Sequence, residues 1–271
     1  MPELAEVDYF RRRWDPGLGR KVAQVRLNPK ARVGRGVDQP AMTQALVGAK
    51  LLESFAAAKQ MAFRFTGNAW IGVHLGMSGR LECGDATRAP TKYDHFVLTM
   101  NGGKQLVFVD PRQFGRILFW QGPGVPPWWE QIPPAILSDE FTVGVVGAFL
   151  RRRARPSIKA VLLMQERFPG IGNWMADEVL WRAGFHPEAK AGAFGPLSVR
   201  KLHRTLREVC ADAMRVIGKD WGDPPANWLF NHRWTDGGRC PRSRQPLQRA
   251  EVGGRTTCWS PARQRLGAER R

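Results

Sequence analysis

The first residues of the chain place an amine next to a carboxylic acid. The sequence begins Met1-Pro2-Glu3, and an initiator methionine before a small residue is normally removed, which would leave the secondary amine of Pro2 at the N-terminus. An α-amino group has a reference pKa of about 7.7 to 8.0, so part of it is unprotonated at neutral pH. Such an amine can attack a sugar C1′ carbon to form a cationic iminium. The adjacent Glu3 could supply or accept the proton that this reaction requires.

The same two residues also have an ordinary interpretation. Proline is common at position 2, and glutamate near a helix N-terminus interacts favourably with the helix dipole. Apolar residues follow at spacings of three and four, which predicts a short helix over residues 3–14 that ends at Asp15-Pro16-Gly17. The pair alone therefore does not decide the function.

The composition points to a polyanionic partner. The 271 residues include 42 Lys plus Arg and 24 Asp plus Glu, a net charge of +18, which favours nucleic acid. The four cysteines form no CxxC pair, so neither a disulfide framework nor an intact zinc site is expected. No secretory signal or apolar stretch of membrane-spanning length is found. We expect a cytoplasmic, nucleoid-associated protein of bacterial type that is monomeric and does not bind membranes.

The chain changes its periodicity about half-way. Short β-type runs lie between Lys21 and about Trp120, at residues 22–27, 60–65, 69–73, 96–100, 105–109 and 116–120, and predict a sandwich or barrel. A Pro- and Gly-rich stretch, residues 122–137, cannot sustain a helix and is interpreted as a linker. Helical patterns follow, with helices expected over 141–150, 157–166, 174–183 and 198–216. The last 39 residues are rich in Arg and predict a small basic hairpin.

Four separated motifs resemble those of one enzyme family. They are Met1-Pro-Glu-Leu-Ala-Glu-Val7, His74-Leu-Gly-Met-Ser-Gly79, Asp110-Pro-Arg-Gln-Phe-Gly115 and Pro169-Gly-Ile-Gly-Asn-Trp-Met-Ala-Asp-Glu178. In this order and spacing they resemble the formamidopyrimidine-DNA glycosylase and endonuclease VIII family, most closely its formamidopyrimidine-DNA glycosylase branch. The resemblance spans nearly the whole chain.

The resemblance implies an α+β fold and a DNA-repair activity. The expected regions are an N-terminal β-sandwich led by a catalytic helix (1–121), the linker (122–137), a helix-two-turn-helix domain (138–232) and a hairpin finger (233–271). The implied function is a bifunctional DNA glycosylase and AP lyase acting on damaged double-stranded DNA without a cofactor. It would remove oxidised bases, such as 8-oxoguanine or formamidopyrimidines, through a proline Schiff base and β,δ-elimination.

Residue roles follow from the matched motifs. Pro2 resembles the family's Schiff-base nucleophile, Glu3 its acid–base partner and Lys59 its β-hairpin lysine, which contacts DNA near the lesion. His74 lies in a Gly-punctuated loop. Met77, Arg112 and Phe114 resemble the trio that fills the hole left by a flipped base. As ordinary residues, Met77 and Phe114 would more often belong to a core, but the neighbouring turn residues favour exposed loop tips.

The helical domain carries the implied phosphate contacts. A glycine-rich loop before a helix exposes backbone N–H groups and the positive dipole end. Asn173 and Lys159 match the family's phosphate contacts, and Arg255 matches the residue at the fingertip. Roles for Glu6, Glu178 and the run Arg151-Arg152-Arg153 stay open, since each could be an ordinary surface or helix residue.

The finger departs from the family pattern. The family usually binds zinc there through two CxxC pairs, whereas this chain has Cys240 and Ser243 at the first pair and Ser260 and Arg263 at the second. We therefore predict a finger without metal, in which Trp234, Leu247 and Trp259 are candidates for the packing that replaces zinc. Ala5 also replaces the usual proline, which should leave the amine chemistry intact.

Two alternatives stay open on sequence grounds. The segment Val216–Trp234 lacks a clear counterpart of the long loop that covers 8-oxoguanine in the formamidopyrimidine branch. An abasic-site lyase with little base excision is therefore one alternative. A non-catalytic damaged-DNA-binding protein is the other, although such a protein would not need the Pro2 amine.

Overall fold

The computed structural model describes residues 2–85 and 87–268, so the expected removal of Met1 and the last three residues of the finger lie outside it. The chain divides into two compact units, Met1–Ile132 and Pro133–Arg271. The division falls inside the segment expected to be a linker. Within the described residues, no helix has the length and apolar character needed to cross a membrane.

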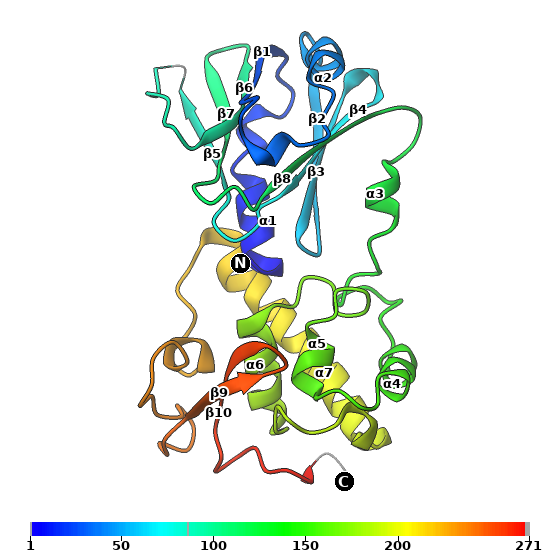
Figure 1. The fold of residues 1–271 in the computed structure, drawn as a ribbon, viewed down its shortest axis with the longest axis vertical. Helices are drawn as coiled ribbons and strands as arrows, with labels where there is room; N and C mark the ends of the chain where they lie inside the picture. Colours follow the sequence, from blue (N-terminus) through cyan, green and yellow to red (C-terminus); the bar gives the residue numbers. More distant parts are fainter. Residues whose placement is uncertain (1, 86, 269–271) are drawn as a thin grey trace. The chain divides into compact units, whose positions relative to one another are not determined.

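The N-terminal unit contains two four-stranded antiparallel sheets. Their strand orders are β1-β6-β7-β5 and β2-β3-β4-β8. Figure 1 shows α1 running between them, and its helical residues contact strands of both sheets. The strands are β1 (Val22–Leu27), β2 (Leu51–Ala57), β3 (Gln60–Phe65), β4 (Ala69–His74), β5 (Arg80–Asp85), β6 (Asp94–Met100), β7 (Lys104–Val109) and β8 (Arg116–Gln121).

The expected helix at the N-terminus is present as α1 (Leu4–Arg12), and Trp14, two residues after its end, contacts both sheets. Trp14 is fully buried, with its ring 4.6 Å from Phe63 of β3 and 6.1 Å from Phe96 of β6, measured between centroids. Its Nε1 donates a hydrogen bond to the Val107 carbonyl at 3.3 Å. A large side chain with a satisfied polar atom therefore closes the shared core and fixes the end of α1.

The sequence patterns missed several elements of this unit. Strands β2 and β5 and helix α2 (Gln39–Leu46) were not predicted. The prediction that residues 122–137 contain no helix is wrong, because Pro127–Glu130 forms the short helix α3. Proline at the first helical position has the backbone angle that a helix requires there. The Trp129 ring of α3 lies 6.3 Å from that of Phe55 in β2, so this part of the segment packs against the N-terminal unit.

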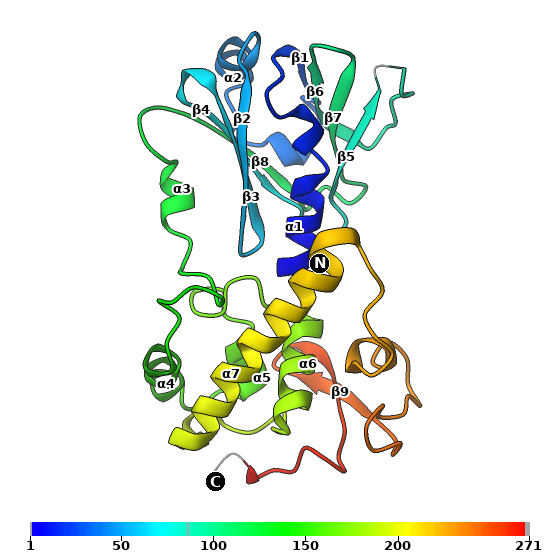
Figure 2. The ribbon, with the colours of Figure 1, turned by 180° about the vertical axis from the view of Figure 1, so that it is seen from behind.

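The C-terminal unit is helical and ends in a hairpin. Figure 2 shows α7 crossing α5 and α6, and its residues contact α6. Almost every residue of α6 is buried, and the helix ends at Gly184, whose φ of 72° is favourable for glycine. The elements are α4 (Val143–Arg152), α5 (Ile158–Leu162), α6 (Asn173–Ala183), α7 (Pro196–Ala213), a π-helical turn (Met214–Gly218), β9 (Gln248–Val252) and β10 (Arg255–Trp259).

Candidate functional site

The start of α1 holds Pro2 and Glu3 in a defined backbone conformation. Glu3 is the N-cap residue and forms a capping box with Glu6, whose Oε2 accepts a hydrogen bond from the Glu3 amide at 3.2 Å. Glu3 is only 3% exposed and Pro2 is half-buried. A capping box satisfies two backbone donors that a helix start would leave unpaired. The structure thus gives Glu6, whose role was open, the task of fixing the segment that carries the candidate amine.

Lys59 and His74 lie near each other although they are far apart in sequence. Lys59 sits in the turn between β2 and β3, where Ala58 has a φ of 56°. The next residue, Gln60, pairs with His74 in the β3–β4 ladder. Burial and the positive charge of Lys59 lower the pKa of His74 below its usual 6.5. His74 is therefore neutral at pH 7.

The hydrogen bond at His74 Nδ1 determines its tautomer. This nitrogen accepts from the Gly76 amide at 3.1 Å, so the ring proton of the neutral form resides on Nε2. A neutral imidazole in this state offers one N–H donor, which suits contact with a phosphate oxygen. Lys59 and His74 together therefore provide an ammonium and an N–H donor at the same end of the sheet.

Met77, Arg112 and Phe114 lie on two adjacent loop tips. Met77 is 42% exposed and Phe114 is 54% exposed, which confirms the expectation that neither belongs to the core. The guanidinium carbon of Arg112 lies 4.9 Å from the centre of the Phe114 ring, a cation–π contact that holds the two side chains together. Exposed apolar side chains of this size on adjacent loops can enter a base stack.

One buried carboxylate joins these two loops. Asp110 is fully buried, and its Oδ1 accepts from the Ser78 hydroxyl at 2.7 Å and from the Arg112 amide at 3.3 Å. Its Oδ2 accepts from the Gly115 amide at 2.7 Å. The loops also touch directly, since a Cβ on Gly76, whose φ is +64°, would lie 2.4 Å from the Phe114 carbonyl carbon. Asp110 therefore fixes the positions of all three tip residues relative to each other.

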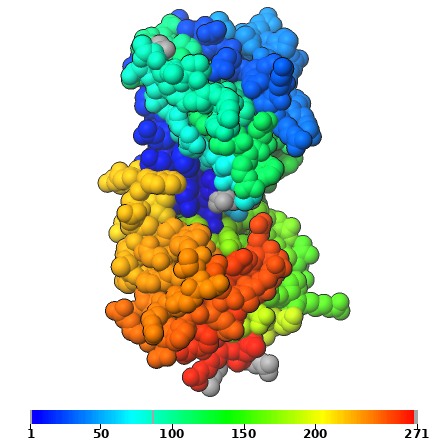
Figure 3. Space-filling view, turned by 60° about the vertical axis from the view of Figure 1, so that its left-hand side comes forward, coloured from blue at the N-terminus to red at the C-terminus, as the bar shows by residue number. Residues whose placement is uncertain are grey.

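Asn173 and the fingertip come together in the C-terminal unit. Asn173 begins α6 directly after Gly172, and its Nδ2 donates to the Thr256 carbonyl at 2.8 Å. Arg255 precedes Thr256, is exposed, and follows the turn Gly253-Gly254, in which both glycines have positive φ. Figure 3 shows the hairpin, in red-orange, at the surface of this unit. Two predicted phosphate-binding residues thus share one surface although they are far apart in sequence.

The structure corrects the assignment of Lys159. Its side chain is fully buried, and its Nζ donates to Asp177 Oδ1 at 2.5 Å and to the Asn173 carbonyl at 2.7 Å. An ammonium buried in this way does not reach a phosphate on the surface. The physical reason is that the buried carboxylate of Asp177, on the next helix, needs a counter-charge, and the Lys159 ammonium supplies it. Lys159 instead positions the residue that begins α6.

Asp177 connects this lysine to the finger. Its Oδ2 accepts from Arg233 Nη2 at 2.6 Å, from Arg233 Nε at 3.1 Å and from the Cys258 amide at 3.0 Å. The side chains of Asp177 and Lys159 are fully buried, and that of Arg233 is 4% exposed. One carboxylate therefore ties together α5, α6, Arg233 at the start of the finger, and strand β10. The sequence analysis missed Asp177 because an ion pair between residues 18 apart leaves no sequence pattern.

Two of the expected zinc-ligand positions, Ser243 and Ser260, lie beside Cys240. Its Sγ accepts hydrogen bonds from the Ser243 amide and from Trp181 Nε1, both at 3.4 Å. Burial alone would raise the pKa of Cys240, but polar groups of Ser243, Trp181 and Ser260 around the thiol lower it to about 6. Hydroxyls and the arginine at position 263 do not fit a tetrahedral zinc site, which needs nitrogen or sulfur ligands or carboxylates. Within the described residues, no group of three or more His, Cys, Asp or Glu side chains could hold a metal ion.

The packing around Cys240 differs from the prediction. Leu247 does pack against the small cluster of Trp181, Leu229, Cys240 and Cys258, and Trp259 is buried. Trp234 is 54% exposed and does not belong to this cluster. Its ring instead contacts Phe230 and the buried guanidinium of Arg233. The central aromatic residue is Trp181, which the sequence analysis did not single out.

The remaining open residues have structural partners. Glu178 is fully buried, accepts from Arg182 Nε at 2.8 Å and from the Phe230 amide at 3.1 Å, and its pKa is raised by burial. It is therefore an internal residue of α6 and not a surface acid. The run Arg151–Arg153 is exposed, and Arg153 forms an ion pair with Glu166.

Two domain families match the sequence. Residues 1–117 match the formamidopyrimidine-DNA glycosylase N-terminal domain and residues 132–221 the formamidopyrimidine-DNA glycosylase H2TH domain. The chain belongs to the formamidopyrimidine-DNA glycosylase family. A formamidopyrimidine-DNA glycosylase of Chloroflexus aggregans is 32% identical over 96% of this chain and 98% of its own length. One of Arabidopsis thaliana is 28% identical over 98% of this chain and 71% of its own.

Solved structures of formamidopyrimidine-DNA glycosylases have the same fold. MutM in complex with DNA containing carbocyclic 8-oxo-G has a TM-score of 0.85 and 26% identity, covering 97% of this chain and all of that one. The Lactococcus lactis enzyme in complex with DNA containing an oxidised pyrimidine has a TM-score of 0.87 and 25% identity, with the same coverage. The expected α+β fold, with sheets in the N-terminal domain and helices and a hairpin in the C-terminal domain, is confirmed.

Replacing Asp110 should destabilise the two loops. In Asp110→Asn the amide nitrogen cannot accept from the donors that the carboxylate satisfies, so at least one buried N–H loses its partner. We expect the free energy of unfolding to fall by about 1–3 kcal/mol, measured by urea unfolding followed by tryptophan fluorescence. Asp85→Asn, which removes a surface carboxylate of the same unit, should change little. Equal stability of Asp110→Asn and wild type would contradict the role given to Asp110.

The titration of His74 tests its electrostatic link to Lys59. Because the pKa of His74 is lowered in the folded state, the neutral form is favoured. The stability that depends on this residue is therefore complete above pH 6.5 and is lost as the pH falls through the lowered value. In an NMR titration, Lys59→Gln should raise the pKa of His74, whereas Lys50→Gln at the far end of the β2–β3 ladder should not. An unchanged pKa in Lys59→Gln would disprove the link.

Asp177→Asn should destabilise the C-terminal unit strongly. It leaves the buried charges of Lys159 and Arg233 without a counter-charge, which costs roughly 3–5 kcal/mol. Asp212→Asn is the matched control, since Asp212 also binds two arginines but its side chain is 31% exposed. Denaturant unfolding should show a much larger loss for Asp177→Asn than for the control. Equal losses of stability in the two variants would contradict the role given to Asp177.

Proposed function

We propose that this protein is a DNA glycosylase with AP lyase activity that removes oxidised bases from double-stranded DNA. Membership of the family supports glycosylase activity in DNA repair. The observation that carries the finer proposal is the capped start of α1, which holds Pro2 and Glu3 in the same unit as the exposed tips of Met77, Arg112 and Phe114. An enzyme that acts on a base needs both a nucleophile and a means of filling the vacated stack.

The amine of Pro2, once exposed, attacks C1′ of the damaged nucleotide. The N–C1′ bond forms as the glycosidic bond breaks, and the departing base takes up the proton that the Pro2 nitrogen releases. Ring opening yields an iminium, and Glu3 gives the ring oxygen the proton that this step needs. The iminium acidifies the C2′ hydrogen, so its removal expels the 3′ phosphate, and a second elimination expels the 5′ phosphate. Hydrolysis of the remaining iminium releases Pro2.

The exposed tips take the place of the flipped nucleotide. Met77 and Phe114 supply apolar surface, and Arg112 supplies hydrogen-bond donors for the base left unpaired. Because Asp110 fixes both loops, these side chains enter the duplex as a preformed unit. We call Met77, Arg112 and Phe114 the wedge. Because the wedge is preformed, less entropy is lost when it binds.

Phosphates are held by groups from both units. Lys59 and the Nε2–H of His74 serve in the N-terminal unit, and Asn173 and Arg255 in the C-terminal unit. The arginine is free to form a bidentate contact with phosphate, and Asn173 lies at a helix N-terminus, where anions bind favourably. Lys159 acts indirectly by holding the carbonyl of Asn173.

An abasic-site lyase with little base excision is the second candidate. The chain between α7 and the finger is short, with a surface residue, Trp221, that is 48% exposed, in place of a long loop over the flipped base. Such an enzyme would share the Pro2 chemistry and differ only in the base pocket. The two candidates differ in the lesion that they prefer. The four lesions to compare are a ring-opened purine, 8-oxoguanine, an oxidised pyrimidine and a bare abasic site.

Borohydride trapping tests the chemistry and the substrate together. The methionine-processed protein is incubated with duplexes that carry each of these four lesions, and a reduced covalent adduct on the peptide beginning at Pro2 is expected. Glu3→Gln should bind an abasic-analogue duplex like wild type, but it should release the damaged base more slowly by a factor of about 10² or more. Trapping with abasic DNA alone would favour the lyase. Tight binding without any trapping would leave only a non-catalytic DNA-binding protein.

A further inference from the structure

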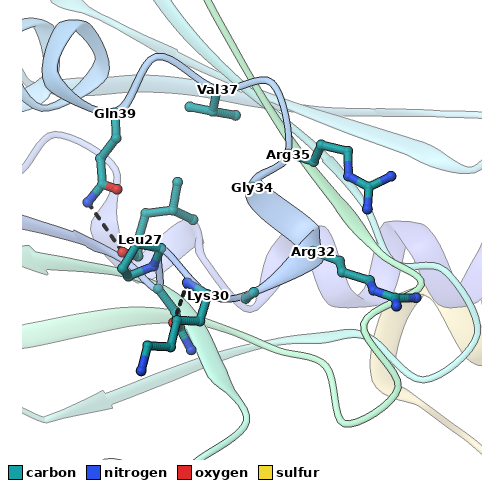
Figure 4. A pocket seen from close by; sticks show the side chains of 10 residues that line it. Leu27, Lys30, Arg32, Gly34, Arg35, Val37 and Gln39 are labelled. Carbon is teal, nitrogen blue, oxygen red and sulfur yellow. Dashed lines mark hydrogen bonds between the residues drawn. The ribbon is translucent and has the colours of Figure 1, made fainter.

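A basic pocket lies in the N-terminal unit outside the residues discussed so far. It has a volume of about 350 Å³ and is formed by the segment between β1 and α2, residues 27–39. Figure 4 shows the side chains of Arg32 and Arg35 extending to the same side of this segment, whereas Lys30 extends away from them. All three cationic side chains are exposed.

The cations of this pocket lack acidic partners. No Asp or Glu lines the pocket, and among the described residues no ion pair involves Lys30, Arg32 or Arg35. The nearest acid in sequence, Asp38, has its Oδ1 bound to the Ala41 amide as the N-cap of α2. Five other arginines of this unit are paired with acids, namely Arg11, Arg12, Arg64, Arg80 and Arg88. Unpaired positive charge around a concavity indicates an anionic ligand.

The pocket is attached to the loop that carries Arg112 and Phe114. The Arg32 amide donates to the Oε1 of Gln113 at 2.9 Å. Gln113 has a φ of 54°, a conformation that is costly for a residue other than glycine and that tends to persist at functional sites. The 3-10 turn η2 (Arg32–Gly34) also packs against β8, the strand that follows this loop. The pocket therefore has a fixed position beside the wedge.

The sheet order places the pocket and the Lys59–His74 pair on opposite sides of the wedge. In the sheet β2-β3-β4-β8, Gln60, His74 and Arg116 stand opposite one another in adjacent strands. Across this row the order is Lys59 before Gln60, then His74, then the loop that enters β8 at Arg116, and η2 packs against β8, which is the edge strand. Neighbouring strands are about 4.8 Å apart, so β3 and β8, which lie two strands apart, are separated by roughly 10 Å. This separation is similar to the width of the DNA major groove, about 12 Å.

We propose that the pocket carrying Arg32 and Arg35 binds the sugar–phosphate backbone of the DNA strand opposite the lesion. The inference rests on the proposed function. If Lys59 and His74 hold phosphates of the damaged strand and the wedge enters the base stack, groups on the far side of the wedge face the other strand. Two guanidinium groups suit phosphodiester oxygens, which each can bind through paired hydrogen bonds. Backbone contact of this kind fixes register and carries no sequence preference.

Neutralising the pocket should weaken duplex binding selectively. In the double variant Arg32→Gln/Arg35→Gln, affinity for a duplex with a tetrahydrofuran abasic analogue should fall about tenfold. The slope of log K against log salt should fall by about 1 for each residue. Affinity for the damaged strand alone should not change. The matched control is Lys21→Gln/Lys50→Gln, which removes two exposed lysines that directly precede β1 and β2 and whose backbones form a β-bridge, and which should leave both affinities unchanged.

A backbone substitution identifies the strand. Neutral methylphosphonates are placed singly along the undamaged strand, and one or two positions near the lesion should weaken wild type but not the double variant. Equal losses on single-stranded and duplex DNA, or no loss on either, would overturn the proposal, as would failure of wild type to bind any duplex. If the arginines govern duplex affinity but no substrate gives a borohydride adduct, the proposed chemistry fails while the pocket assignment stands.

Discussion

A carboxylate removed from water must be surrounded by donors, and this constraint determines the loop geometry of both units. In the N-terminal unit Asp110 takes donors from two loops, and in the C-terminal unit Asp177 takes donors from a helix, a connecting segment and a strand. Neither acid belongs to the exposed residues that would touch DNA. Each sets the geometry of such residues instead, because moving a donor away would leave a buried negative charge unsatisfied.

The cationic residues discussed above have two different roles. Lys159 and Arg233 are buried and serve the interior, where their charges are matched by Asp177. Arg255, Arg32 and Arg35 are exposed, and the last two line a concavity without acids. The net charge of +18 thus says little about which cation meets a polyanion. Burial and the presence of a counter-charge separate the two groups.

Most of the fold could be predicted from the sequence where local signals were strong. Glycine and proline around Met77 and Phe114 correctly indicated exposed tips, and helical spacing identified α1, α6 and α7. The predictions failed where partners are distant. Lys159 looked like a surface residue because lysines are mostly exposed, and nothing in the sequence shows that Asp177 faces it. Strand β5 lacked a clear apolar alternation, and its identity depends on pairing with β7.

The attachment of the finger to α6 has a chemical consequence. A carboxylate, an ammonium, a guanidinium and a backbone amide make this attachment. None of these contacts needs a metal ion, whereas a zinc-bound finger loses its fold when a chelator removes the metal. The contacts around Asp177 should therefore survive a chelator that unfolds thiolate-bound fingers.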